Sequence, residues 1–322
     1  MNNIGYSYND ISIIPAEISK VNSRSEIELE SLPIFTAPMS TIVDIDCLQT
    51  YIDNKITPII PRNIDINIRK KYLTQYWTAL SLKEARKLFL EDGLLSNYNY
   101  RICIDIANGH MQQLINLCKE IKLNYKNVVI MTGNIANPNT LLYYSGIIDY
   151  VRLGIGSGFG CITSSNTGIH YPMASLINEC YKVKNENNLK IKLVADGGIR
   201  NYSDVIKALA LGADYVMIGG LFARFIEICP SNIIEDELGK FRTFYGMASK
   251  MGQIALTGQV TKTAEGISKT IKVNEKLSDW IKNMEHYLRS AMSYCNSLTL
   301  SEFIGKPKII INSYSTLNSV NK

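Results

Sequence analysis

The chain has 322 residues, of which 46% are hydrophobic and 20% are charged, and 34 basic against 29 acidic side chains leave a net charge of +5. The basic excess is small and spread along the chain, so nucleic acid is not an expected partner. No apolar run approaches the roughly 18 residues of a membrane span, and the first residues lack the basic start and apolar core of a signal peptide. We therefore expect a cytoplasmic protein that binds neither membranes nor nucleic acid.

Cysteine and histidine usage argues against covalent or metal cross-links. The seven cysteines are odd in number and scattered, and no CxxC pair occurs. This pattern is typical of a reducing compartment and not of a disulfide framework. The three histidines have spacings that match no zinc site. We expect no structural metal.

Eight short apolar segments alternate with helical patterns along the chain. The predicted strands are Ile34–Ala37, Thr57–Ile60, Tyr76–Leu80, Arg101–Ile106, Val128–Thr132, Tyr150–Leu153, Lys192–Ala195 and Tyr215–Ile218. Several are apolar on both faces, as parallel strands covered by helices are. Amphipathic helices are predicted after Gly109 and after Asn201, the second starting at Ser203 and Asp204 and ending at Gly212. Eight such units predict an α/β fold, a (β/α)8 TIM barrel. A doubly wound open sheet is the alternative, because strand order cannot be read from one sequence.

Three parts of the chain lie outside this alternation. Residues 1–32 form an N-terminal extension, expected to be a short hairpin that covers the bottom of the barrel. Residues 233–274 are polar and poorly periodic, which predicts an active-site flap after the last strand. Residues 279–322 hold a closing helix, Asp279–Cys295, and a tail with a strand-like PKIIINS. We expect residues 1–322 to be a single barrel domain.

The loops after the strands are rich in glycine and small polar residues. In a (β/α)8 barrel the catalytic groups lie on these loops, at the carboxyl ends of the strands. The six loops are APMST (37–41), DIANGH (105–110), MTGN (131–134), GIGSGFGCITSSNTG (154–168), ADGGIRN (195–201) and GGLFA (219–223). We expect the functional site at this end of the barrel.

The loops ADGGIRN and GGLFA follow the last two strands, where many barrels bind a phosphate through backbone N–H groups. Glycine lets the backbone approach the anion closely and adopt positive φ angles. These glycines could instead only form tight turns. Asp196, in the first of the two loops, could accept hydrogen bonds from a ribose diol or could cap a helix.

The loop GIGSGFGCITSSNTG is open to two interpretations. Its glycine spacing invites a dinucleotide-binding fingerprint, but no helix follows it directly, and the acidic residue about twenty positions on, Glu179, falls within a helix. The alternative is a loop whose carbonyls coordinate a monovalent cation and which presents Cys161 to the mouth of the barrel. Cys161 could also be an inert buried cysteine, as most cysteines are.

Residues 153–172, LGIGSGFGCITSSNTGIHYP, resemble the cysteine loop of the IMP dehydrogenase/GMP reductase family. Further segments resemble the family's other motifs in the same order: YSYNDISIIPAEISKVNSRSEI, PIFTAPMST, IDIANGH, MTGN, VADGGIRNYSDVIKALALGADYVMIGG, FYGMAS, TAEG and LRSAMSY. The resemblance covers nearly the whole chain. It implies a (β/α)8 barrel that assembles as a homotetramer.

Within the family, the details resemble the reductases more than the dehydrogenases. No regulatory CBS modules fit between Ile60 and Tyr76, and the flap segment 250–265 lacks the Arg-Tyr pair with which dehydrogenases activate water. FYGMAS, residues 244–249, is close to the reductase form of its motif. The implied reaction converts GMP and NADPH to IMP, ammonia and NADP⁺.

The implied mechanism uses three side chains. The Cys161 thiolate attacks C2 of the purine, expels ammonia and leaves a covalent thioimidate, which hydride from the nicotinamide reduces. Thr163 and Glu265 correspond to the pair that assists proton transfer to the leaving amino group. The alternative for Glu265 is a solvated carboxylate of the flap.

The resemblance also implies the binding residues. Those expected to bind the purine nucleotide are Met39, Asp196, Gly197, Gly198, Gly219, Gly220, Tyr245, Met247 and Ser249. Those expected to bind NADPH are Asp105, Asn108, Asn134 and Lys262. The carbonyls expected to bind a monovalent cation, K⁺, are those of Gly156, Gly158 and Cys161.

Three departures from the family leave other functions open. Phe159, two residues before the cysteine, replaces a serine that contacts the nucleotide phosphate, and Ser40 replaces an aspartate. The cofactor region 76–98 aligns poorly, so NADPH in place of NADH rests on the family alone. The alternatives are an IMP dehydrogenase-like enzyme, an enzyme for a modified purine nucleotide, and a non-catalytic nucleotide-binding barrel.

Overall fold

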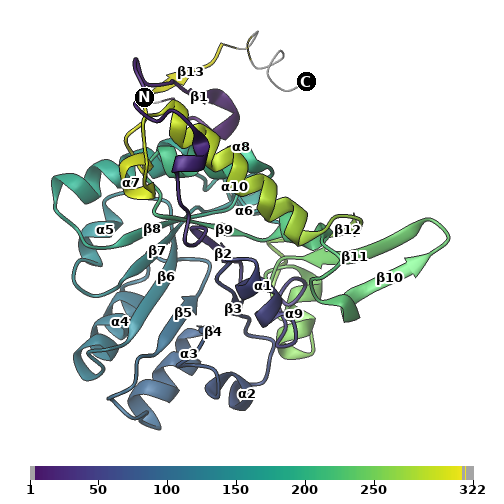
Figure 1. Cartoon of the computed structure of the whole chain (residues 1–322). Helices are drawn as coiled ribbons and strands as arrows, with labels where there is room; N and C mark the ends of the chain where they lie inside the picture. The colour runs from purple at the N-terminus through teal and green to yellow at the C-terminus, as the bar shows by residue number, and fades with distance from the viewer. Residues whose placement is uncertain (1–3, 314–315, 317–322) are drawn as a thin grey trace.

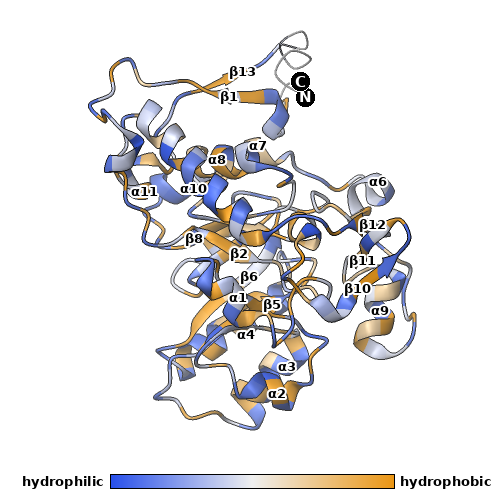
Figure 2. Ribbon diagram, turned by 45° about the vertical axis from the view of Figure 1, so that its right-hand side comes forward, coloured by the Kyte–Doolittle hydropathy of each residue, from blue (hydrophilic) through white to orange (hydrophobic). Residues whose placement is uncertain are grey.

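The computed structural model describes residues 4–313 and residue 316 (Figure 1). Its main sheet has eight parallel strands: β2 (Ile34–Thr36), β3 (Ile59–Ile60), β4 (Trp77–Leu80), β5 (Arg101–Asp105), β6 (Val129–Ile135), β7 (Tyr150–Leu153), β8 (Lys192–Asp196) and β9 (Tyr215–Ile218). Each lies on a strand predicted from the sequence. Figure 2 shows hydrophobic residues gathered along these strands.

The sheet closes into a barrel between its two outermost strands. The strand order is β2-β9-β8-β7-β6-β5-β4-β3. Phe35 of β2 forms a parallel bridge with Thr57, just before β3. The N–H of Thr57 donates to the carbonyl of Ile34 at 3.0 Å, and the N–H of Ile59 donates to Oγ1 of Thr36 at 2.9 Å. The predicted (β/α)8 barrel is therefore confirmed, and the open doubly wound sheet is excluded.

Helices connect successive strands on the outside of the barrel (Figure 1). They are α1 (Leu48–Asp53), α2 (Ile66–Lys70), α3 (Leu82–Arg86) with a π-helical continuation (Lys87–Glu91), α4 (Gln112–Asn124), α5 (Thr140–Tyr143), α6 (Thr163–Thr167), α7 (Met173–Glu186) and α8 (Tyr202–Ala210). Helix α8 follows Asn201 as predicted, but the residue that caps it is Asn201, whose side chain accepts the N–H of Asp204 at 3.0 Å. Gly212 follows its last turn with φ +113°, a conformation that favours glycine.

Four aromatic rings fill the amino-terminal end of the barrel. Trp77, Tyr150 and Tyr215 are the first residues of their strands, and Phe35 packs against all three with ring centroids 5.6, 5.8 and 5.0 Å away. Such edge-on and tilted contacts are favourable arrangements for aromatic pairs. Because this end is filled with side chains, a site inside the barrel can open only at the carboxyl ends of the strands.

The N-terminal extension differs from the prediction. Its strand β1 (Ile11–Ile13) forms no hairpin with a neighbouring segment but pairs antiparallel with β13 (Ile309–Ile311) in the tail. The expected hairpin was wrong because the partner strand comes from the other end of the chain, which no local pattern reveals. The strand-like tail PKIIINS is confirmed as β13. Short 3₁₀ turns, Tyr8–Asp10 and Arg24–Glu26, complete the extension.

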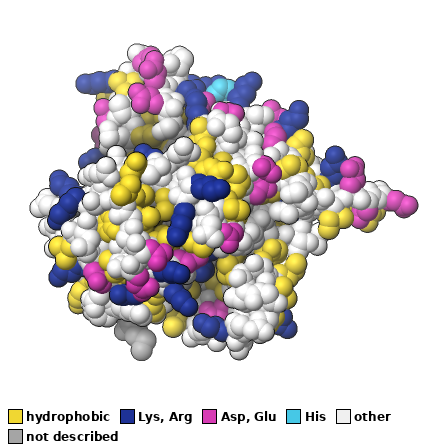
Figure 3. All heavy atoms as spheres, turned by 90° about the horizontal axis from the view of Figure 1, so that it is seen from below, with side chains coloured by type: hydrophobic (Ala, Val, Ile, Leu, Met, Phe, Trp, Pro, Cys, Tyr) yellow, Lys and Arg dark blue, Asp and Glu magenta, His cyan; other side chains and the backbone are white. Residues whose placement is uncertain are grey.

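The segment after β9 has secondary structure of its own. After two 3₁₀ turns, Gly220–Arg224 and Pro230–Asn232, it forms a three-stranded antiparallel sheet and one helix. These elements are β10 (Ile233–Asp236), β11 (Gly239–Tyr245), α9 (Lys250–Thr257) and β12 (Ser268–Lys272). The β10–β11 hairpin projects from the barrel (Figure 1), and Figure 3 shows acidic side chains toward its tip. We call residues 233–274 the flap.

The chain ends with α10 (Leu277–Tyr294), the predicted closing helix, and α11 (Leu300–Phe303) before β13. Helix α10 packs Trp280 against the ring of Tyr202 at the start of α8, with centroids 5.2 Å apart. Within the described part of the chain, no helix has both the length and the apolar character needed to cross a membrane.

Candidate active site

The loops after β7 and β8 pack against each other at the open end of the barrel. Gly154, at the end of β7, and Gly197, after β8, have φ angles of +123° and +105°. A Cβ atom at Gly154 would collide with the carbonyl oxygen of Asp196, and one at Gly197 would collide with Ser157. The Ser157 hydroxyl also donates to the Asp196 carbonyl at 3.2 Å. Glycine at these two positions therefore allows the cysteine loop to lie beside the loop of Asp196.

Cys161, Thr163 and Glu265 form one chain of hydrogen bonds. The half-buried Cys161 thiol donates from Sγ to Oγ1 of Thr163 at 3.3 Å. The Thr163 hydroxyl in turn donates to Oε2 of Glu265 at 2.9 Å. Thr163 is the first residue of α6, whereas Glu265 lies in the flap between α9 and β12. The structure thus brings together the three residues expected to be catalytic.

Backbone contacts hold the flap on the cysteine loop. The N–H of Ile162 donates to the carbonyl of Glu265 at 3.0 Å, and the N–H of Ile267 donates to the carbonyl of Gly160 at 2.9 Å. Between these bonds, Cys161 and Gly266 form an antiparallel bridge. Glu265 therefore reaches Thr163 because its backbone is paired with the cysteine loop and not through the side chain alone.

A chain of ion pairs crosses the open end of the barrel beside these residues. Arg152 of β7 donates from Nη1 to Oδ1 of Asp105 at 2.6 Å and from Nη2 to Oδ2 of Asp196 at 2.8 Å. Arg62 donates to the second oxygen of Asp105 at 3.0 Å. The Asn134 amide donates to Oδ2 of Asp196 at 2.7 Å. Arg152 and Arg62 were not among the predicted site residues.

The surroundings fix the charges in this chain. Burial alone would raise the pKa of Asp105, but Arg152 and Arg62 outweigh it and hold this pKa below its ordinary value. Burial disfavours the charged form of Arg152, yet Asp196 and its other neighbours raise the pKa of this guanidinium. Burial raises the pKa of the neighbouring Cys103 thiol to about 12. Asp105 and Arg152 are therefore ionised at neutral pH, and Cys103 is a neutral thiol.

The glycines of the last two strands lie at the same end of the barrel. Gly198 follows Asp196 with φ +76°, and Gly219 follows β9. A Cβ atom at Gly219 would lie 3.1 Å from the Met39 sulfur. The Tyr245 hydroxyl, at the end of β11, accepts a hydrogen bond from Ser40 at 3.2 Å. Residues from the first strand loop, the last strand and the flap therefore meet here.

The family model of the IMP dehydrogenase / GMP reductase domain matches residues 92–320. This chain belongs to that family. It is 32% identical over 319 residues to a GMP reductase of Oceanobacillus iheyensis, which covers 92% of each chain. It is 31% identical to a GMP reductase of Ligilactobacillus salivarius, covering 92% of this chain and 93% of that one. A GMP reductase 2 of Mus musculus is 27% identical over 327 residues, covering 94% and 92%.

The residues that the family resemblance assigned to the cofactor separate into two groups. Asp105 and Asn134 belong to the chain of ion pairs. Asn108 and Lys262 are exposed. The side chain of Asn108 accepts the N–H of His110 at 3.0 Å, and the backbone of Lys262 is held by the Gln253 side chain, with the Lys262 N–H donating at 2.9 Å.

Two further residues assigned by the resemblance support the flap. Ser249 is buried, and its hydroxyl accepts the N–H of Gly252 at 3.0 Å, which caps α9. Met247 is half-buried, and its backbone packs directly against Gly252 of α9. A Cβ atom at Gly252 would collide with the Met247 backbone. These contacts orient the turn between β11 and α9.

The carbonyls expected to bind a cation already accept hydrogen bonds within their own loop. The carbonyl of Gly156 accepts the Ser164 hydroxyl at 3.2 Å. The carbonyl of Gly158 accepts the N–H of Cys161 at 3.0 Å. Each carbonyl oxygen keeps a second lone pair that can coordinate a cation, and the chemistry of the site is derived from the side chains alone.

A group of potential metal ligands lies outside the site. Within residues 4–313, the ligand atoms of Asp44, Cys47 and Cys229 lie within 4.8 Å of one another, and the two sulfurs are 3.7 Å apart. The buried guanidinium of Arg242 donates to the carbonyl of Cys229 at 3.5 Å. Because this positive charge lies beside the group and opposes a second cation, we assign no ion here.

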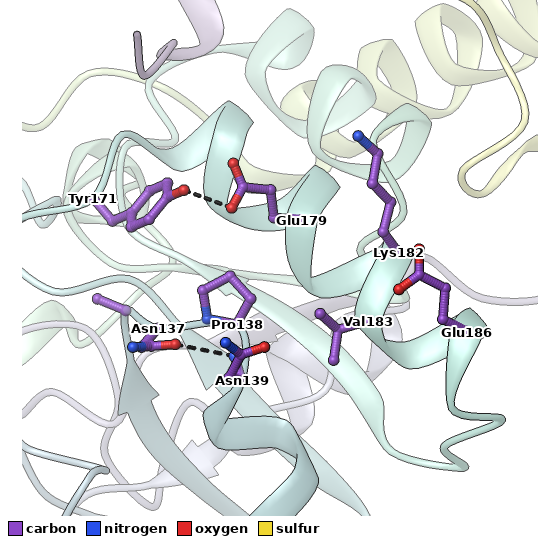
Figure 4. A pocket seen from close by; sticks show the side chains of 9 residues that line it. Asn137, Pro138, Asn139, Tyr171, Glu179, Lys182, Val183 and Glu186 are labelled. Atoms are coloured by element: carbon purple, nitrogen blue, oxygen red, sulfur yellow. Dashed lines mark hydrogen bonds between the residues drawn. The ribbon is translucent and has the colours of Figure 1, made fainter. Parts of the chain in front are cut away.

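A separate hollow of about 490 Å³ lies between α7 and the segment that joins β6 to α5 (Figure 4). Tyr171 donates to Glu179 at 2.6 Å on one side of it, and Asn137 and Asn139 lie on the other. None of the residues predicted for catalysis or binding lines this hollow. It is therefore distinct from the candidate active site.

Proposed function

We propose that this protein is a GMP reductase that converts GMP and NADPH to IMP, ammonia and NADP⁺. The observation that carries the proposal is the hydrogen-bonded chain from Cys161 through Thr163 to Glu265. A thiol, a hydroxyl and a carboxylate in this order supply a nucleophile and a route for its proton. The relatives named GMP reductase, which match over nearly the whole chain, support the same reaction.

The first chemical step is attack of the Cys161 sulfur on C2 of the purine. The thiol proton points to Thr163, whose own proton points to Glu265, so the thiol can ionise as a proton reaches the carboxylate. The same route returns a proton to the amino group at C2, which leaves as ammonia. The purine then remains bound to Cys161 through a C–S bond at C2.

NADPH, when bound, supplies the hydride that reduces C2, after which the C–S bond breaks and the Cys161 thiolate is regenerated. The exposed amide of Asn108 and the exposed ammonium of Lys262 fit a ligand with a carboxamide and phosphates. Asp105 acts through its ion pair with Arg152, and Asn134 acts through its hydrogen bond to Asp196. Both contacts hold the side chains at the base of the site in place.

The nucleotide is held by the loops after the last two strands. All three hydrogen bonds to the Asp196 carboxylate reach Oδ2, and no donor in the described part of the chain reaches Oδ1. Oδ1 is therefore the atom that accepts a ribose hydroxyl. The backbone N–H groups of Gly198, Gly219 and Gly220 bind the phosphate, as glycine-rich loops at strand ends do. Met39, Gly197, Tyr245, Met247 and Ser249 line or support this site.

Several further expectations stay predictions. They are the homotetramer, the cytoplasmic location, the single domain over residues 1–322 and the K⁺ ion at Gly156, Gly158 and Cys161.

A screen of purine nucleotides against NADPH, NADP⁺ and NAD⁺, followed at the nicotinamide absorbance band, tests the proposal. We expect NADPH oxidation that depends on GMP, with formation of IMP and ammonia in equal amounts. Robust formation of xanthosine monophosphate from IMP would place the protein with the dehydrogenases. No turnover of any purine nucleotide would indicate a non-catalytic barrel.

A further inference from the structure

Phe159 lies against the loop that follows β9. A Cβ atom at Gly220 would be 2.8 Å from Cδ1 of the Phe159 ring, so the ring rests on the open side of this glycine. The ring is 49% exposed, and its other neighbour is Phe244, with centroids 5.8 Å apart. A phenyl ring cannot donate a hydrogen bond to an anion. The ring therefore forms an apolar wall on one side of the Gly219–Gly220 loop.

A lysine of the flap lies on this wall. Nζ of Lys269 is 4.0 Å from the centroid of the Phe159 ring. Lys269 on β12 is directly opposite Phe244 on β11, and directly opposite residues of an antiparallel pair project from the same face. The register of the flap sheet thus directs both side chains to Phe159, and the ammonium lies on the ring that covers Gly220.

The charge of Lys269 is not balanced by a carboxylate. The ion pairs formed within residues 4–313 do not include it. Lys269 is half-buried as a whole residue, and its ammonium lies on the face of the Phe159 ring. A cation–π contact contributes about 0.5–2 kcal/mol and leaves the positive charge able to attract an anion. An anionic ligand bound at the Gly219–Gly220 loop would supply the negative charge that Lys269 lacks.

We propose that Lys269, positioned on the Phe159 ring, binds the phosphate of the purine nucleotide and makes the site specific for nucleoside monophosphates over nucleosides. This inference rests on the proposed function, because it takes the Gly219–Gly220 loop as the phosphate site. Phe159 is the positioning residue, and Lys269 provides the charge that the ring cannot.

Titration calorimetry with GMP and with guanosine, in the absence of NADPH, tests the inference. The variants are Lys269→Met and, as a matched control, Lys272→Met, because Lys272 is on the same strand but an odd number of residues away and so projects from the other face. We expect Lys269→Met to weaken GMP binding about 10- to 100-fold, as loss of a charged hydrogen bond does. Guanosine binding should stay unchanged, and Lys272→Met should alter neither affinity.

A further variant separates a charge effect from a packing effect. Lys269→Arg keeps the charge and should retain GMP affinity within a few fold, including where Lys269→Met does not fold. Equal losses for GMP and guanosine in Lys269→Met, or no loss for either, would overturn the inference. So would a wild-type protein that binds GMP no more tightly than guanosine.

These experiments distinguish failure of the Lys269 inference from failure of the proposed function. A protein that binds GMP through Lys269 but does not oxidise NADPH contradicts only the proposed function. A protein that reduces GMP equally well with and without Lys269, at nucleotide concentrations below saturation, contradicts only the inference.

Discussion

Thr163 and Glu265 are 102 positions apart in the chain, and the hydroxyl of the first donates to the carboxylate of the second at 2.9 Å. The contact joins the barrel to the flap, and backbone pairing between Cys161 and Gly266 fixes it. A carboxylate placed in this way can take a proton from the cysteine and return it to a leaving group. The proposed chemistry therefore requires the flap to lie on the cysteine loop.

Glu265→Gln should slow deamination of GMP about 10²- to 10⁴-fold, the usual contribution of general acid–base assistance. Glutamine keeps the size and the hydrogen bond to Thr163 but cannot accept the proton, so GMP affinity should change little. Hydride transfer in the reverse direction, from a preformed covalent adduct, should be much less affected. Single-turnover measurements of ammonia release and of nicotinamide absorbance compare the two steps. Equal losses in both steps, or a loss of affinity alone, would mean that Glu265 is structural.

The direction of the reaction follows from the composition of the flap. The segment 250–265 has no Arg-Tyr pair that could activate water against a covalent intermediate. The enzyme should therefore show little or no oxidation of IMP by NAD⁺, whereas GMP and NADPH are consumed. Chromatography of the purine products checks this, and accumulation of xanthosine monophosphate is the result that the proposal does not allow.

The ion pairs of Asp105 should contribute to stability in a pH-dependent way. The pKa of Asp105 is lowered in the folded protein, so its contribution is fully present above the ordinary pKa of an aspartate and is lost as the pH falls through the folded value. Asp105→Asn leaves Arg62 and part of Arg152 unpaired and should lower the free energy of unfolding by about 3–5 kcal/mol at pH 7. Urea unfolding between pH 3 and 7 measures the difference.

For Asp105→Asn, the gap to the wild type should stay constant from pH 5 to 7 and narrow as the pH falls below about 4. The exposed Asp53, changed to Asn, serves as the control and should have little effect at any pH. A gap that is independent of pH down to pH 3 would show that the carboxylate charge of Asp105 does not stabilise the fold.

The aromatic rings at the amino-terminal end of the barrel should stabilise the fold without contributing to the site. Phe35→Ala should lower the free energy of unfolding by about 3–5 kcal/mol, as removal of a buried aromatic ring does. GMP affinity of the folded variant should stay close to that of the wild type, because the site lies at the opposite end of the barrel. Leu142→Ala, on an exposed position of α5, is the control. A specific loss of GMP affinity in Phe35→Ala would contradict this separation.

The sequence predicted the barrel strands and the three residues of the hydrogen-bonded chain, because both leave local patterns. Each strand is a short apolar run, and Cys161, Thr163 and Glu265 lie in motifs that resemble those of the family. Arg152 was missed because a single arginine within an apolar strand gives no sign of its partners, which lie 47 and 44 positions away at Asp105 and Asp196. The pairings of β1 with β13 and of β11 with β12 were missed for the same reason, since both join segments that are distant in the chain. The β10–β11 hairpin is local, but its residues are polar and lack a regular apolar alternation.

The central claim is that the Cys161 sulfur forms a covalent bond with C2 of the purine. The most direct test measures GMP-dependent NADPH oxidation and GMP binding for Cys161→Ala. We predict that turnover is abolished while GMP still binds, because the covalent step is removed but the phosphate and ribose contacts remain. A Cys161→Ala protein that keeps near-full activity would contradict the account.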